Sequence, residues 1–131
     1  MEKKMTGQIV FITTSQIQNG ALERVKEAVR KSVDFIETNG PQLMAEAYID
    51  ENELRFHSIQ IHRDSESILT HWQLADPYMR DVMQYITTTR VDIFGHPNQA
   101  VMEGMQRLSS QGAVLFVTPR FAGFSRLTSS A

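Results

Sequence analysis

The apolar positions along the chain switch between the spacing of strands and the spacing of helices. A run of β-branched and aromatic residues at 8–16 predicts a largely buried strand. Asn19-Gly20 interrupts this run, and Asn19 is placed to cap a following helix. Between residues 22 and 36, apolar side chains recur at three- and four-residue steps, with charged residues mostly on the other side. This pattern predicts an amphipathic helix, which Asn39-Gly40-Pro41 would end.

Two extended segments follow, joined by a polar turn at 50–53, and together they predict a β-hairpin. The first segment, 43–50, alternates, with Leu43, Ala45, Ala47 and Ile49 on one face and Met44, Glu46 and Tyr48 on the other. In the second segment, 54–63, the apolar phase slips between Phe56 and Ile59. Either a β-bulge lies there or both faces of the sheet are covered.

The second half of the chain predicts further helices and strands. Asp64 is a plausible N-cap for a helix in which Ile68 and Trp72 share one face. We expect Asp76-Pro77 to interrupt this helix, because proline disfavours the helical conformation of the residue before it. A separate helix would then carry Tyr78, Val82, Tyr85 and Ile86. A strand over 87–94, a turn at 95–98, a helix over 98–110, a strand over 113–118 and a short closing segment at 121–126 complete the prediction.

The resulting order of elements is β-α-β-β-α-β, followed by an extra helix and strand. This order predicts a ferredoxin-like α+β domain over residues 1–131, with helices packed on one face of an antiparallel sheet. The other face must also be covered, and the chain has no segment left to cover it. We therefore expect a homodimer, in which a second copy covers that face.

Composition narrows the classes of partner and site. The chain has 131 residues, 41% hydrophobic and 21% charged, with a formal charge of −2, so it has no basic excess to favour nucleic acid or anionic lipid. It contains no cysteine, which excludes disulfides and thiolate metal sites. No apolar run is long enough to span a membrane, and the charged start Met1–Met5 has no signal-peptide core, so we expect a cytoplasmic protein.

One group of residues resembles a known family. Arg63-Asp64, then His71 seven residues after Asp64, and then Asp76-Pro77-Tyr78 are similar to a motif of the antibiotic biosynthesis monooxygenase-like proteins. His62 stands where that family usually has Tyr, Asp76 where Ser is usual, and Tyr78-Met79 where His-Phe is usual. Gly95-His96-Pro97 and the later Pro119 and 123–126 are also similar to members of this family.

The resemblance implies a dimeric α+β barrel and an oxygenase that needs no cofactor. It would bind a small aromatic or enolic substrate in an apolar cavity, and His71 would assist deprotonation of that substrate so that the anion reacts with oxygen directly. Two alternatives remain. One is a haem-binding or haem-degrading protein of the same fold, in which His71 would approach the iron. The other is a non-catalytic dimer that binds a small molecule.

The candidate site residues each have a structural interpretation as well. His71 is the candidate catalytic residue, or a half-buried histidine bonded to a neighbour. The resemblance would make Trp72, Tyr78 and Tyr85 walls of the cavity, although a tryptophan on a helical stripe is usually core. His62 faces the interior with Gln60, Ser58 and Phe56, or is a polar residue at a strand end.

Glu46 and Tyr48 line the barrel, with Glu46 as a candidate base, or they lie on an edge strand in water. His57 and His62 are five residues apart on a strand and so point to opposite faces, which argues against a metal site. The glycines follow no phosphate-loop or dinucleotide-binding spacing.

Overall fold

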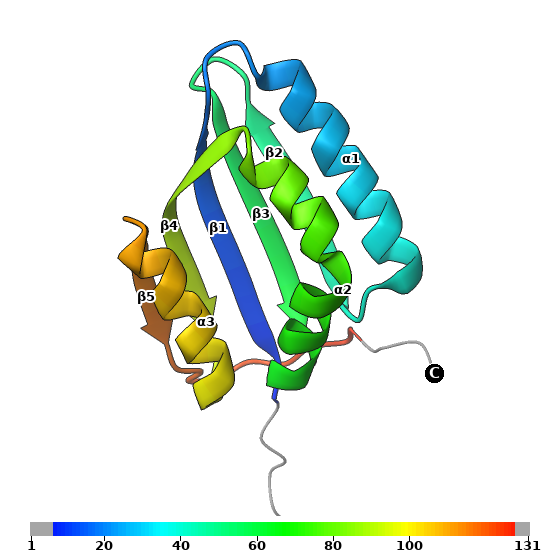
Figure 1. Ribbon diagram of the computed structural model, residues 1–131. Coiled ribbons are helices and arrows are strands. Elements are labelled where there is room, and N and C mark those ends of the chain that lie inside the picture. The colour runs from blue at the N-terminus through cyan, green and yellow to red at the C-terminus, as the bar shows by residue number, and fades with distance from the viewer. Residues whose placement is uncertain (1–6, 128–131) are drawn as a thin grey trace, which may run out of the picture.

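The polypeptide folds into a five-stranded sheet with three helices on one side (Figure 1). The computed structural model describes residues 7–127, and the N-terminal segment Met1–Met5 lies outside them. The elements are β1 (Ile9–Ile17), α1 (Leu22–Asn39), β2 (Met44–Asp50), β3 (Arg55–His62), α2 (Ser65–Met83), β4 (Ile86–Phe94), α3 (Gln99–Ser110) and β5 (Val114–Thr118).

The strands lie in the order β2-β3-β1-β4-β5. The first four form the antiparallel ferredoxin-like sheet that the order of elements predicts, and β5 joins β4 in parallel after α3. A parallel neighbour needs a crossover, and α3 provides it. Within the described residues, 119–127 form neither helix nor strand, so the predicted closing segment adds no element to the sheet.

The hairpin of β2 and β3 pairs without a register shift, from Asp50 opposite Arg55 to Met44 opposite Ile61. The phase slip in the sequence is therefore not a bulge: Phe56 faces the helices, whereas Ile59 and Ile61 face the other side of the sheet. The register shift lies elsewhere, between Thr14 and Ser15 where β1 pairs with β4.

Helix α2 runs from Ser65 to Met83 and includes Pro77 in its interior, so the predicted interruption is wrong. Proline removes one backbone hydrogen bond and disfavours the helix by about 3 kcal/mol. Burial of His71 and Ala75 before it and Val82 after it on the same side of α2 offsets this cost, and Pro77 itself points to solvent. Tyr85 lies beyond the helix, and Ile86 begins β4 instead of belonging to a helix.

The helix caps follow the sequence prediction only in part. The Asp64 side chain accepts a hydrogen bond from Ser67 N at 2.9 Å, and Asn98 accepts one from Val101 N at 3.0 Å. The prediction for Asn19 is wrong, because α1 has Ala21 at its N-cap and no side-chain cap. The chain enters α1 through a turn in which Ala21 N donates to Gln18 O at 3.0 Å.

The core between the helices and the sheet consists of two apolar clusters. One cluster gathers around β4 and α3 and comprises Ile9, Phe11, Ile68, Val91, Ile93, Val101, Met105 and Ala113. The other gathers around α1 and the end of α2 and comprises Ile17, Ala21, Val25, Ala28, Val29, Phe56, Val82 and Ile86. The space between the two clusters is not filled by apolar side chains, and it holds the candidate site.

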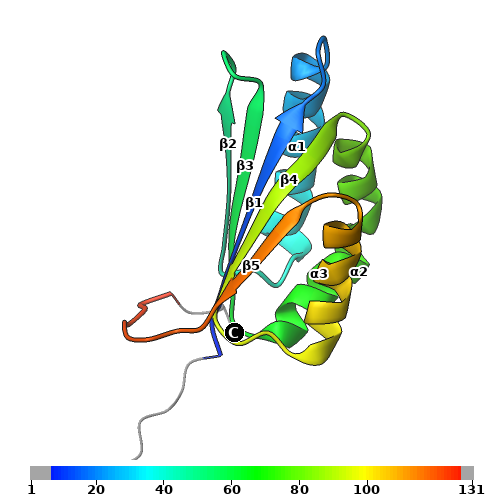
Figure 2. The ribbon, with the colours of Figure 1, turned by 90° about the vertical axis from the view of Figure 1, so that its left-hand side faces the viewer.

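All three helices cover the same face of the sheet, which leaves the opposite face without a layer from this chain (Figure 2). We call this opposite side the open face. It carries the large side chains Tyr48, Phe94, Val114 and Phe116, each at least 41% exposed. No helix in the described range 7–127 is long and apolar enough to cross a membrane.

Candidate functional site

A cavity of about 390 Å³ separates the two apolar clusters and lies between the sheet and helices α1, α2 and α3. Apolar side chains from both clusters form much of its wall, including Phe11, Ile68 and Met105 on one side and Val29, Phe56 and Val82 on the other. This volume lies within the range of small-molecule sites, and apolar walls with few polar groups are typical of them.

The cavity exists because helix-facing positions in the middle of the sheet are polar. On β1 these positions hold Thr13 and Ser15, and on β3 they hold Ser58, Gln60 and His62. Small or polar side chains cannot extend an apolar core across the sheet. They therefore leave a gap, and several of them bond to one another: Ser15 Oγ lies 3.2 Å from Thr88 Oγ1.

His71 comes from the middle of α2 and reaches the cavity wall, as expected from the sequence. His71 is 5% exposed, and its Nδ1 lies 2.8 Å from Nε2 of Gln42. Burial lowers the pKa of His71 from 6.5 to about 4, because the imidazolium loses its hydration. The imidazole is therefore neutral at pH 7.

His62 lies beside His71, with ring centroids 5.8 Å apart. It is 1% exposed, and its interior placement with Gln60, Ser58 and Phe56 matches one of the two sequence interpretations. Its Nδ1 lies 2.8 Å from Ser67 Oγ and its Nε2 lies 2.9 Å from Gln60 Oε1. Burial first, and then the nearby His71, lower the pKa of His62 to about 3, against an opposing effect of Asp64.

Trp72 lines the cavity and packs on α3. A Cβ atom added at Gly104 would lie 2.4 Å from Trp72 Cζ3, so Gly104 is what lets the indole lie against the helix. This contact explains a glycine in the middle of α3, where it otherwise weakens the helix.

The three tyrosines of the sequence prediction lie elsewhere. Tyr78 stacks on Phe35 between α2 and α1, with ring centroids 4.5 Å apart, and Tyr85 packs against the cluster around α1. Tyr48 is 53% exposed on the open face. None of the three is part of the wall described for this cavity, whereas Met79, next to Tyr78, is.

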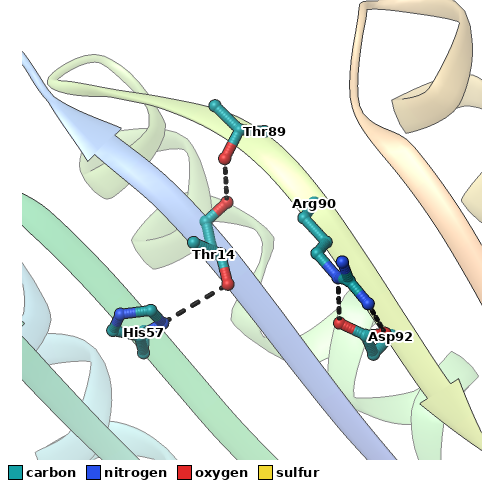
Figure 3. A network of polar contacts seen from close by, with 5 residues as sticks. All are labelled: Thr14, His57, Thr89, Arg90 and Asp92. Carbon is teal, nitrogen blue, oxygen red and sulfur yellow. Dashed lines mark hydrogen bonds and ion pairs between the residues drawn. The ribbon is translucent and has the colours of Figure 1, made fainter.

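Glu46 borders the cavity at the β2 edge and is itself exposed. Its side chain shares the open face with Tyr48, which matches the edge-strand interpretation within this chain. His57 also lies on the open face and bonds Thr14 Oγ1 at 3.3 Å (Figure 3). His62 lies on the helix-covered face, so His57 and His62 point apart as predicted. Within residues 7–127, no three histidine or acidic side chains are grouped to hold a metal ion.

No pattern in the sequence predicted that Gln42 and Ser67 belong to the site. Gln42 lies in the loop after Gly40-Pro41 and contacts both Gln60, at 3.3 Å, and His71. Ser67 lies in the first turn of α2, where serine is common, yet it also contacts His62. Only the packing of α2 and this loop over β3 brings them together.

Solved structures with the same architecture come from several bacteria and an archaeon. MupZ from Pseudomonas fluorescens matches with a TM-score of 0.73 and 14% identity over 96% of this chain and 94% of that one. SnoaB from Streptomyces nogalater, a cofactor-independent oxygenase, matches with a TM-score of 0.59 and 9% identity over 71% of this chain and 96% of that one. A conserved protein from Methanosarcina mazei matches with a TM-score of 0.60 and 10% identity, covering 72% of this chain and 95% of that one.

A putative antibiotic biosynthesis monooxygenase from Nitrosomonas europaea also matches, with a TM-score of 0.56 and 12% identity over 65% of this chain and 85% of that one, so this chain has the fold seen in such proteins. The expected ferredoxin-like α+β class is therefore confirmed. No protein-family profile matches the sequence, and no curated protein matches it significantly. At identities of 9–14% the structural likeness shows the fold alone, and the chemistry has to be argued from the cavity.

Proposed function

We propose that the protein is a cofactor-independent monooxygenase that binds a small aromatic or enolic substrate in the cavity between the helices and the sheet. The observation that carries this proposal is a neutral, buried histidine on the wall of an otherwise largely apolar cavity. The fold shared with the cofactor-independent oxygenase SnoaB gives further support.

The chemistry follows from what a neutral imidazole can do in a cavity whose wall is largely apolar. His71 hydrogen-bonds to the enolic or phenolic oxygen of the substrate and so favours its ionised form, while the substrate proton is released to solvent water. The electron-rich anion reacts directly with dioxygen at the adjacent carbon. The ring carbon that is CH₂ in the keto form of the substrate is thereby oxidised to a carbonyl: one oxygen atom of O₂ enters the product, and the other leaves as water with the two hydrogens of the keto form's CH₂ group.

The apolar wall has two tasks in this scheme. Trp72 and Met79 hold the ring of the substrate in one orientation, and the flanking core residues keep water away from the reactive anion.

The test is oxygen uptake by the purified protein with a panel of dihydroxynaphthalenes and anthrone, each corrected for uptake without protein. We expect His71→Ala to lower kcat about 100-fold or more. The exposed His96 provides a matched control, because His96→Ala removes an imidazole that is not part of the cavity wall. Equal turnover by wild type and His71→Ala, with both folded by circular dichroism, would remove His71 from the mechanism.

Haem binding is separated from this function by an absorbance titration with haemin. A Soret band that saturates at one haem per subunit and is lost in His71→Ala would replace the oxygenase proposal with a haem site. Binding of the aromatic panel without oxygen uptake would instead support the non-catalytic binding protein.

We also propose that a second copy of the chain covers the open face. That face combines exposed apolar side chains with satisfied polar pairs: Arg90 bonds Asp92 at 2.8 and 3.0 Å (Figure 3) and lies over the ring of Phe116, with 4.3 Å from its guanidinium carbon to the ring centroid. Monomeric proteins rarely expose contiguous apolar patches of this kind.

Light scattering at several protein concentrations tests the dimer. Phe116→Glu should shift the protein to the mass of one subunit, because it places a charge within the covered face. Leu74→Glu is the matched control, since Leu74 is also 43% exposed but lies on a helix, away from the open face. A single-subunit mass for the wild type would refute the dimer.

A further inference from the structure

Five polar residues connect the start of α2 with the cavity, and we call them the polar network: Ser67, His62, Gln60, Gln42 and His71. Consecutive members are joined by contacts of 2.8 Å from Ser67 to His62, 2.9 Å from His62 to Gln60, 3.3 Å from Gln60 to Gln42 and 2.8 Å from Gln42 to His71. They come from three separate parts of the chain: α2, β3 and the loop before β2. The network ends on the histidine to which the proposed function gives the central role.

The hydrogen bonds of such a network have a direction. Each amide exposes a donor end and an acceptor end, and each neutral imidazole has one of each, so the direction of one bond determines the next. In the first direction, Ser67 donates to His62, His62 Nε2 and Gln42 Nε2 both donate to Gln60 Oε1, and Gln42 Nε2 also donates to His71 Nδ1. His71 then carries its proton on Nε2.

In the opposite direction both amides are turned around and every bond is reversed. His71 Nδ1 then donates to Gln42 Oε1, and His71 Nε2 becomes a bare acceptor. At the other end, His62 Nδ1 donates to Ser67 Oγ, and the Ser67 hydroxyl must then donate to the carbonyl oxygen of Pro41. Toward a ligand, His71 Nε2 is thus a hydrogen-bond donor in the first direction and an acceptor in the opposite direction.

Two observations favour the first direction. First, the opposite direction requires Ser67 to donate to Pro41 O, and at 3.5 Å that bond is much weaker than a donation to His62 Nδ1 at 2.8 Å. Second, the first direction leaves Gln42 Oε1 buried and without a partner in the described part of the chain. The reverse would bury both N–H groups of that amide there instead, and buried donors without partners are rarer than under-satisfied carbonyl oxygens.

In the first direction, the two network nitrogens that are left without a partner are both hydrogen-bond donors. Gln60 Nε2 and His71 Nε2 have no hydrogen-bond partner among the described residues. Neither atom is fully buried, since Gln42 Oε1 is the fully buried atom without a partner in this part of the chain. Both residues line the cavity.

We propose that the polar network fixes His71 as its Nε2–H tautomer, so that the cavity presents two hydrogen-bond donors, Gln60 Nε2 and His71 Nε2, to an oxygen acceptor of the ligand. Gln42 is the positioning residue, because it holds the His71 tautomer without belonging to the donor pair. The ligand class is an enolate, a phenolate or a carbonyl compound. The identity of this oxygen as the reacting one rests on the proposed function, whereas the tautomer and the donor pair do not.

The tautomer is measured directly by long-range ¹H–¹⁵N correlation spectra of the imidazoles at pH 7, with the His71 signals assigned by their loss in His71→Gln. We expect the wild type to show a protonated Nε2 and a bare Nδ1. In Gln42→Glu the carboxylate can only accept a hydrogen bond, so Nδ1 of His71 should gain a proton. Gln73→Glu is the matched control, because it adds the same charge on the exposed side of α2 and should leave the tautomer unchanged.

A wild-type His71 with its proton on Nδ1 would overturn the proposal, and so would an unchanged tautomer in Gln42→Glu.

The donor pair is tested by titrating the protein with 4-nitrophenol, whose ionised form absorbs at visible wavelengths, and separately with 4-nitroanisole, which cannot ionise. We expect the bound phenol to ionise at a pH at least one unit below the free compound. Gln60→Met, similar in shape but without donors, should weaken binding of the phenolate about 10-fold with little effect on the anisole.

Preferential binding of the un-ionised phenol would count against the donor pair. The outcomes also separate this inference from the proposed function. Oxygen uptake by a protein with the Nδ1–H tautomer would refute the inference and leave the oxygenase standing. An Nε2–H tautomer with a lowered phenol pKa and no oxygen uptake would support the inference and refute the oxygenase.

Discussion

The two buried histidines make the stability of the fold depend on pH in a predictable direction. His62 and His71 are 1% and 5% exposed, and burial lowers their pKa values to about 3 and about 4. In the unfolded chain both imidazoles regain a pKa of about 6.5. As the pH falls below that value the unfolded state takes up protons that the folded state does not bind, so the free energy of unfolding decreases.

The size of this effect follows from the same values. At pH 5 the unfolded imidazoles lie about 1.5 units below their pKa, and at about 1.4 kcal/mol per unit each costs the folded state about 2 kcal/mol. The two together cost about 4 kcal/mol between pH 8 and pH 5, a large part of the stability of a typical domain. The loss continues as the pH falls toward the folded pKa values and ends below about pH 3.

Urea unfolding followed by circular dichroism at pH 8, 6.5 and 5, at one fixed protein concentration, measures this dependence. His71→Gln should lose about half of it, because only His62 then contributes. His96→Gln should keep all of it, since that imidazole is exposed. A wild-type free energy of unfolding that differs by less than 1 kcal/mol between pH 8 and pH 5 would refute the reasoning.

Three further predictions concern local packing and helix ends. Gly104→Ala should destabilise the fold by about 1–3 kcal/mol and shift the emission of Trp72, the single tryptophan, because the new methyl group would meet the indole; an unchanged spectrum and stability would mean that the indole does not lie against α3. Asp64→Ala should lower stability by about 1 kcal/mol through the lost N-cap bond to α2, and Asn98→Ala should do the same at α3, both read from thermal unfolding. Pro77→Ala should raise the free energy of unfolding in urea, because an exposed position inside α2 regains its backbone hydrogen bond, and a loss of stability would contradict this account.

Local patterns in the sequence carried the order of the elements. Apolar spacing placed all five strands and the helices α1 and α3 close to their observed ranges, because each element must bury one face of its own. The local rule failed at Pro77. The burial of His71 and Ala75 on one side and Val82 on the other holds α2 together across the proline, and that packing involves residues far away in the chain.

The candidate site divides in the same way. The family resemblance implied that His71 and Trp72 lie at the cavity, and the interior position of His62 was one of two interpretations of its place on β3, whereas Tyr78 and Tyr85 are recognisable as wall or core residues only after the elements are packed. The ring of Tyr78 stacks on Phe35 of α1 and is not part of the cavity wall described here, so its role toward a ligand stays a prediction.

The sequence by itself determined the fold class, the cap of α2 by Asp64 and the alternation that separates the two faces of the sheet, since all of these depend on the local geometry of helices and strands. Tertiary structure alone decided that a cavity forms between two apolar clusters and that Gln42 and Ser67 join the histidines around it. The physical reason is that these hydrogen bonds connect a loop, a strand and a helix up to 29 positions apart, and no local pattern encodes a contact that exists only after the helices pack on the sheet.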